Sequence, residues 1–259
     1  MRRPSPARDS AGPDHGEGTL FGGRLTLLQP RRGYRVNVDT LLLAQFAALG
    51  RPKARRVVDL GAGVGALALA YGFLGTVGHL DLVERDAELA RLAAQNIVRA
   101  GHTGTPHVVD LVRAGLPPAL RGVADVVLSN PPFFPETAGT AAQASQRGAR
   151  TGPLAPFLVA AASALGRRAY AFFAYPAPAL AELLDGARSA QLVAKRLRFV
   201  HAFAGSPARL VLVELRRAKP GGLIVEPPLV EWTARNVRSP EVGSLVDAGL
   251  LTRREVDPE

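Results

Sequence analysis

The chain has 259 residues, 47% of them hydrophobic, and its 32 basic and 22 acidic side chains give a formal net charge of +10. This length and apolar content predict one large globular domain with a full core. There is no cysteine, which excludes disulfides, zinc–thiolate sites and thiol nucleophiles, and the five histidines are too scattered to indicate a metal site. The positive charge favours a polyanionic partner such as RNA, although a genome that prefers arginine would give the same excess.

The two ends of the chain differ from its centre. Residues 1–18 are rich in Pro, Gly, Ser, Asp and Arg, and we expect them to form a disordered tail. No apolar stretch follows the first arginines, so no signal peptide is expected, and the most apolar segments contain prolines or are too short to cross a bilayer. We therefore expect a cytoplasmic protein with no membrane contact, one domain over 19–235 and a weakly structured tail over 236–259.

Strand-like and helix-like segments alternate along the domain. A short β segment over 19–35 precedes a helix that Asp39 and Thr40 are expected to cap. Strands are then predicted over 55–60, 79–83, 106–109, 124–129 and 168–175, with helices after the first, second, fourth and fifth of them. Asp86 is expected to cap the helix after the second strand. Two long segments, 191–201 and 209–216, look like a closing hairpin. This alternation predicts an α/β fold.

A glycine-rich loop joins the first of these strands to its helix. Asp59 lies near the end of the strand, and the loop contains Gly61, Gly63 and Gly65. Glycines let the backbone approach a ligand closely at a helix N-terminus. The next two strands end in Glu84 and Asp110, and an acidic residue after the second strand is where a ribose diol is usually held. Each carboxylate alone could be a helix cap, but three in register with a glycine loop predict a nucleoside pocket.

A stiff tetrapeptide follows the buried strand over 124–129: Asn130, Pro131, Pro132 and Phe133. Each proline fixes its own φ, lacks an N–H and pushes the preceding residue towards an extended backbone. The Asn130 side-chain oxygen and the Pro131 carbonyl could accept both N–H bonds of an exocyclic amine and free its lone pair, while Phe133 stacks on the ring. A turn that simply ends the strand is the alternative.

The spacing of the glycines narrows the choice of cofactor. Gly-x-Gly-x-Gly differs from the Gly-x-Gly-x-x-Gly of dinucleotide enzymes, and no Lys-Ser/Thr follows for a phosphate loop. Asp59 would repel a pyrophosphate but suits an ammonium group. S-adenosylmethionine has such an ammonium, a ribose diol for Glu84 and an adenine amine for Asp110. The sequence therefore predicts S-adenosylmethionine as the cofactor and no metal.

Taken together, these motifs resemble those of class I methyltransferases that act on amino groups. In that class the tetrapeptide corresponding to Asn130–Phe133 reads Asn/Asp-Pro-Pro-Tyr/Phe. Further segments are similar to the bacterial valine-tRNA adenine-N6 methyltransferase family: 21–25, 29–35, 39–43, 150–151, 206–214 and 227–229. The resemblance runs from about residue 19 to residue 245. It implies a Rossmann-like fold with a seven-stranded, mostly parallel sheet whose last strand is antiparallel. It also implies that RNA approaches Asn130.

We therefore expect N6-methylation of an adenine in RNA, with tRNA as the first choice, by a monomeric enzyme. Tyr34 and Asp39 are expected to close over the cofactor, with core packing and helix capping as their alternative roles. Candidate phosphate contacts, each of which could instead be an ordinary surface charge, are Arg31, Arg32, Arg35, Arg147, Arg150 and Arg209. Two other functions stay open: N5-methylation of a glutamine side chain in a release factor, and non-catalytic binding of cofactor or RNA.

Overall fold

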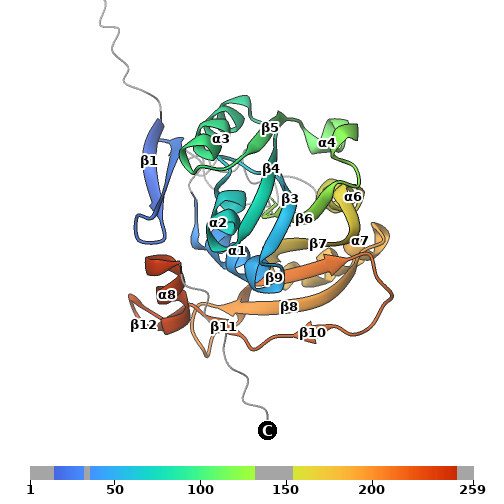
Figure 1. Ribbon diagram of the computed structural model, residues 1–259. Coiled ribbons are helices and arrows are strands. Elements are labelled where there is room, and N and C mark those ends of the chain that lie inside the picture. The colour runs from blue at the N-terminus through green and yellow to red at the C-terminus, as the bar shows by residue number, and fades with distance from the viewer. Residues whose placement is uncertain (1–14, 32–35, 132–153, 250–259) are drawn as a thin grey trace, which may run out of the picture.

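The computed structural model of the protein describes residues 15–31, 36–131 and 154–249. A central sheet is packed between two layers of helices (Figure 1). Its long strands are β3 Lys53–Leu60, β4 Thr76–Glu84, β5 Gly104–Val108, β6 Ala124–Ser129, β7 Leu165–Pro176, β8 Val193–His201 and β9 Ala208–Arg216. They lie side by side in the order β8-β9-β7-β6-β3-β4-β5.

The sheet is mostly parallel. β5, β4, β3, β6 and β7 each run parallel to their neighbours in this series, whereas β9 pairs antiparallel with both β7 and β8. The predicted fold, with an antiparallel last long strand, is thereby confirmed. Two short strands, β10 Ile224–Val225 and β11 Leu229–Val230, pair with β8 and bring the sheet to nine strands where the sequence predicted seven. Two-residue strands in a proline-rich segment are too short to show any periodicity.

The helices divide between the two faces of the sheet. They are α1 Val38–Gly50, α2 Ala66–Leu74, α3 Ala87–Arg99, α4 Leu111–Ala114, α6 Ala155–Ala164, α7 Leu180–Ser189 and α8 Pro240–Ala248, with 3-10 turns η1 Pro118–Leu120 and η3 Ala177–Ala179. Val126 and Leu128 of β6 face the core with α1, α2, α3 and α8, and Val127 faces the core with α4, α6 and α7. A strand covered on both faces needs an apolar residue at every position, which explains the unbroken run in β6. No helix within the described ranges is both long enough and apolar enough to cross a membrane.

Helix caps follow the sequence with one exception. The Asp86 carboxylate accepts hydrogen bonds from the Glu88 and Leu89 N–H groups and caps α3, as predicted. The cap of α1 is Asn37, whose side-chain oxygen accepts from the Thr40 N–H at 3.3 Å. Asp39 and Thr40 thus lie inside the helix, and the expectation that they cap it is wrong.

The ordered domain extends beyond the boundaries that the sequence suggested. A hairpin of β1 His15–Leu20 and β2 Leu25–Pro30 begins inside the segment expected to be a disordered tail. A second hairpin pairs β12 Trp232–Ala234 with β13 Val237–Arg238, and β13 and α8 lie inside the expected C-terminal tail. Leu245 of α8 is fully buried in the core that contains α1. Both end segments are ordered by packing against the rest of the domain, which local composition does not reveal.

Candidate active site

The carboxyl ends of three neighbouring strands meet at one edge of the sheet. Leu60 of β3 lies opposite Val83 of β4 and Ser129 of β6. The next residues on the two outer strands, Glu84 and Asn130, are therefore held on either side of the loop that follows β3. Open α/β sheets bind their ligands at this edge.

The glycine-rich loop has a backbone that depends on its glycines. Gly61, Gly63 and Gly65 have φ values of +74°, +56° and +82°, in the left-handed region that favours glycine. A Cβ on Gly65 would also lie 2.8 Å from the Leu82 Cδ1. The Gly61 N–H donates to the Val83 carbonyl at 2.8 Å, so the loop is fixed to β4.

Asp59 of β3 caps α2, the helix that follows this strand. Its carboxylate is 1% exposed and accepts a hydrogen bond from the Ala68 N–H at 3.1 Å. The residue at the N-cap position of α2 is Gly65, which has no side chain for this purpose. Burial raises the pKa of Asp59 to about 7; the bond from Ala68 opposes this shift and the charge of Glu84 adds to it. A cation bound nearby would favour the ionised carboxylate.

Glu84 holds the loop and keeps acceptor capacity. Its Oε2 accepts from the Gly63 N–H at 2.8 Å, and its Oε1 accepts from the Asp86 N–H at 2.9 Å. A carboxylate offers about four lone-pair positions, so these two bonds leave room for a donor such as a ribose hydroxyl. The predicted diol contact is compatible with this geometry and stays a prediction.

Asp110 caps α4, and helix capping was the alternative to its predicted role in a nucleoside pocket. Its Oδ1 accepts from the Val112 N–H at 2.9 Å and from the Arg113 N–H at 3.4 Å, at the start of α4. The Arg113 Nε lies 3.7 Å from the other carboxylate oxygen. Contact of Asp110 with an adenine amine therefore remains a prediction that this cap neither requires nor prevents.

Asn130 has an acceptor without a donor. Its Oδ1 is buried, and in the part of the chain that the structure describes it has no hydrogen-bond partner. The preceding residue is fixed, because the Ser129 Oγ donates to the Leu60 carbonyl at 2.9 Å. An unpaired buried oxygen costs about 1–3 kcal/mol, so such a group in a folded protein calls for an explanation. A ligand N–H at this edge would supply the missing donor.

Asp39 and Arg209 are engaged with each other. The Arg209 guanidinium donates to the Asp39 Oδ1 at 2.6 Å and to the Glu231 Oε2 at 2.5 Å. Asp39 and Glu231 are both buried, at 7% and 5% exposure. The three residues join α1, β9 and the segment before β12. This geometry favours a structural role for Asp39 and Arg209, and their predicted contacts with cofactor and phosphate gain no support from it.

The other predicted site residues fall into two groups. Pro131 is buried and follows Asn130 after the end of β6. The Arg31 Nε donates to the His15 carbonyl at 3.2 Å within the N-terminal hairpin. The remaining candidates lie outside the described residues: Pro132, Phe133, Tyr34, Arg32, Arg35, Arg147 and Arg150.

One buried residue that supports the loop was not predicted. Asn96 of α3 is fully buried; its Oδ1 accepts from the Leu28 N–H at 2.7 Å. Its Nδ2 donates to the Leu28 carbonyl at 2.9 Å and to the Val64 carbonyl at 3.0 Å. The amide thus connects α3, β2 and the glycine-rich loop. A polar residue among the apolar positions of an amphipathic helix was the available signal.

These groups fit the donors of S-adenosylmethionine. The unpaired Asn130 oxygen, the remaining acceptor positions of Glu84 and the buried Asp59 carboxylate are all acceptors on one sheet edge. They suit a ligand that brings N–H, hydroxyl and ammonium groups, and they do not suit a pyrophosphate. Within the described residues, no group of three or more His, Asp or Glu side chains could hold a metal ion.

Known proteins with a similar sequence are methyltransferases. Residues 35–150 match the family described as the methyltransferase small domain. A release factor glutamine methyltransferase of Agrobacterium fabrum is 32% identical over 148 residues, which cover 53% of this chain and 49% of the relative. A tRNA1(Val) (adenine(37)-N6)-methyltransferase of Pedobacter heparinus is 32% identical over 101 residues, 39% of this chain and 41% of the relative. The chain thus spans about half the length of the relatives it matches.

Solved structures show the same fold. A predicted O-methyltransferase from Agrobacterium tumefaciens has a TM-score of 0.62 at 22% identity, covering 80% of this chain and 94% of that one. A 16S rRNA methyltransferase from T. thermophilus, in complex with AdoMet and guanosine, has a TM-score of 0.55 at 18% identity, covering 79% and 50%. At these identities the likeness concerns the fold alone.

The fold is that of class I S-adenosylmethionine-dependent methyltransferases, and the glycine-rich loop and the matched domain agree with this class. More narrowly, residues 35–150 are similar to the methyltransferase small domain. S-adenosylmethionine is the cofactor of this class.

Proposed function

We propose that the protein methylates the exocyclic N6 of an adenine in RNA, with tRNA as the substrate. The observation that carries the proposal is the buried, unpartnered Oδ1 of Asn130, on the same sheet edge as the glycine-rich loop and Glu84. S-adenosylmethionine, when bound, supplies an electrophilic methyl group on its sulfonium. The chain must then supply an acceptor amine that is positioned and made nucleophilic.

Asn130 provides that activation. The lone pair of an adenine N6 is delocalised into the ring, which makes the amine a poor nucleophile. A fixed acceptor for one of its N–H bonds favours a pyramidal nitrogen and localises the lone pair. The Asn130 Oδ1 is one such acceptor, and the Pro131 carbonyl is the proposed second one. Preorganised groups of this kind typically contribute about 3–4 kcal/mol of barrier lowering each.

Two features favour RNA as the acceptor. The formal net charge is +10, which suits a polyanion. Several relatives, at about one-third identity, bear the name tRNA1(Val) (adenine(37)-N6)-methyltransferase. We also propose a cytoplasmic location, where tRNA is modified, and a monomeric enzyme.

A second candidate is N5-methylation of a glutamine side chain in a protein. The similarity to a release factor glutamine methyltransferase over 53% of this chain favours it. A side-chain amide also carries a conjugated NH2 group, so Asn130 would serve either acceptor in the same way. The excess of basic side chains makes RNA the better candidate.

Labelled methyl transfer distinguishes these functions. The purified protein is incubated with S-adenosylmethionine carrying a tritiated methyl group, together with total bacterial RNA or total bacterial protein. We expect the label in RNA. Label in the protein fraction alone would favour the glutamine reaction, and cofactor binding without any transfer would favour a non-catalytic protein.

A further inference from the structure

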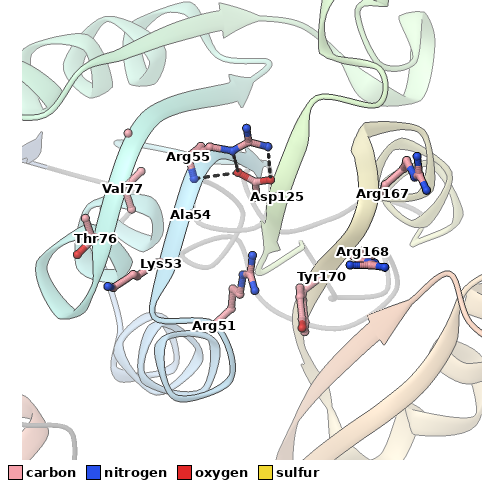
Figure 2. Close-up of a pocket in the computed structure, with 11 residues that line it drawn as sticks. Arg51, Lys53, Ala54, Arg55, Thr76, Val77, Asp125, Arg167, Arg168 and Tyr170 are labelled. Carbon is pink, nitrogen blue, oxygen red and sulfur yellow. Dashed lines mark hydrogen bonds and ion pairs between the residues drawn. The ribbon is translucent and has the colours of Figure 1, made fainter.

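A basic cavity lies at the opposite edge of the sheet from the active site. It has a volume of about 800 Å³ and is lined at the amino ends of β3, β4, β6 and β7, as Figure 2 shows. We call it the amino-edge cavity. Its basic lining residues are Arg51, Lys53, Arg55, Arg167 and Arg168.

The charge of this cavity is mostly uncompensated. An acidic side chain, Asp125, also lines it, but it accepts hydrogen bonds from the Arg55 N–H at 2.8 Å and from the Arg55 guanidinium at 3.4 Å. Among the described residues, Arg51, Lys53 and the two arginines of β7 have no carboxylate within ion-pair distance. Four unpaired cations around one hollow favour an anionic ligand.

A bulge in β7 directs two of these cations to the edge. Leu165 pairs with Ala124 and Tyr170 with Val126, so the register of β7 against β6 shifts across the segment that contains Arg167 and Arg168. Arg168 has a φ of +57°, a left-handed conformation that is uncommon outside glycine. Bulges of this kind redirect side chains at the ends of strands. Nothing in the packing of the exposed Arg168 side chain accounts for the strained backbone.

Arg51 adds an unsatisfied donor. Its Nε is buried and, in the described part of the chain, has no hydrogen-bond partner. Its guanidinium lies 5.2 Å from the centre of the Tyr170 ring, and the Tyr71 hydroxyl donates to its backbone carbonyl, which fixes the start of the side chain. In Figure 2, Arg51 lies between Lys53 on one side and Arg168 with Tyr170 on the other. An anion in this position would satisfy the orphaned donor.

We propose that the amino-edge cavity binds the phosphodiester backbone of the RNA substrate, at a distance from the reacting base. This inference rests on the proposed function. β3 has eight residues, so at about 3.3 Å per residue the two edges are roughly 26 Å apart. A folded RNA is large enough to reach both. The cations come from separate elements on different sides of the hollow, which suits a chain of phosphates better than one small anion.

The test removes three exposed charges without disturbing an ion pair. The variant combines Lys53→Gln, Arg167→Gln and Arg168→Asn, because asparagine tolerates the left-handed backbone at that position. A matched control removes one lysine and two arginines that are exposed elsewhere: Lys219→Gln, Arg188→Gln and Arg235→Gln. Binding of an unmodified tRNA transcript is measured from 50 to 300 mM salt, and S-adenosylmethionine binding is measured by calorimetry.

The cavity variant should bind the transcript at least about tenfold more weakly at 100 mM salt. Its slope of log affinity against log salt should be smaller by about 2, since each lost phosphate contact removes about 0.7–0.9. The KM for tRNA should rise with little change in kcat, and cofactor affinity and the thermal midpoint should equal those of the wild type. The control variant should retain most of the affinity.

Three outcomes would overturn the inference, and they are distinguishable from one another. If the wild type methylates tRNA and the cavity variant binds and methylates it equally well, the site is wrong and the proposed function stands. If inorganic phosphate binds the wild type and not the variant while tRNA affinity is unchanged, the cavity is a small-anion site. If the wild type binds S-adenosylmethionine but neither binds nor methylates RNA, the proposed function itself fails.

Discussion

At the scale of single residues, Asn130, the proposed acceptor for a substrate amine, lies at the end of a buried strand. β6 is covered on both faces, and Ser129 is bonded to Leu60, so Asn130 starts from a rigid backbone. Positioning of this kind is effective only when the supporting residues cannot move.

Replacement of Asn130 should separate turnover from cofactor binding. We expect Asn130→Ala to lower kcat about 10²- to 10³-fold, the usual loss for one preorganised polar group, with S-adenosylmethionine affinity within about twofold. Steady-state kinetics and calorimetry measure the two effects. Asn130→Asp is the comparison, because it keeps an acceptor oxygen at this position and should retain more activity than the alanine variant. Full activity in Asn130→Ala would contradict the proposed role of Asn130 as the acceptor for the substrate amine.

Asp59 should make stability depend on pH. Its pKa is raised to about 7 in the folded state, so the folded state holds this proton more tightly than the unfolded state does. The free energy of unfolding should therefore fall as pH rises from about 4 to 7, by up to about 4 kcal/mol from this group. Asp59→Asn keeps an acceptor for the Ala68 N–H and should flatten the dependence. Urea unfolding at pH 5 and pH 8 tests this, and an equal pH dependence in both proteins would contradict it.

Replacement of Arg209 should distinguish a structural ion pair from a contact with RNA phosphate. Its removal in Arg209→Gln would leave the buried carboxylates of Asp39 and Glu231 without their cation. We expect a loss of about 3 kcal/mol in the free energy of unfolding, with little change in the salt dependence of RNA binding. Arg235→Gln, at an exposed site, is the control. A stable Arg209 variant with weakened RNA binding would instead support the phosphate contact that the sequence suggested.

At the scale of elements, the N-terminal hairpin and the glycine-rich loop share one anchor. Asn96 of α3 bonds both backbone groups of Leu28 and the carbonyl of Val64, next to the loop glycines. In Figure 1 the hairpin lies beside α3, at the edge of the molecule. This arrangement couples the position of the hairpin to the conformation of the cofactor loop.

Asn96→Leu should therefore affect both stability and cofactor affinity. The variant leaves one N–H and two carbonyls without their partners, which should cost about 3 kcal/mol in total. S-adenosylmethionine should bind more weakly because the loop is less well held. Denaturant unfolding and calorimetry measure these effects, with Arg91→Gln on the exposed face of the same helix as the control. Loss of stability with unchanged affinity would limit Asn96 to a structural role.

The elements that the sequence predicted best are those with strong local signals. The bounds of β6 agree at both ends, and α3 begins after its predicted cap Asp86, because an unbroken apolar run and an Asx cap are local features. The position of Asn130 beside the glycine-rich loop was also predictable, since parallel strands align their carboxyl ends. Asn96 and the contact between Asp39 and Arg209 were not, because they depend on residues far apart in the chain.

At the scale of the whole molecule, the two edges of one sheet have different chemistry. The carboxyl edge gathers the acceptors Asp59, Glu84 and Asn130, and the amino edge gathers unpaired arginines and a lysine. A protein with a net charge of +10 that separates its charges in this way can hold an anionic substrate at one edge and present its base at the other.

Methylation of an unmodified tRNA transcript, followed by nucleoside analysis, tests the central claim most directly. The wild type is predicted to place the tritiated methyl group in N6-methyladenosine, and Asn130→Ala is predicted to give less than about 1% of that rate. Label in another nucleoside, label only in protein, or undiminished methylation by Asn130→Ala would contradict the account.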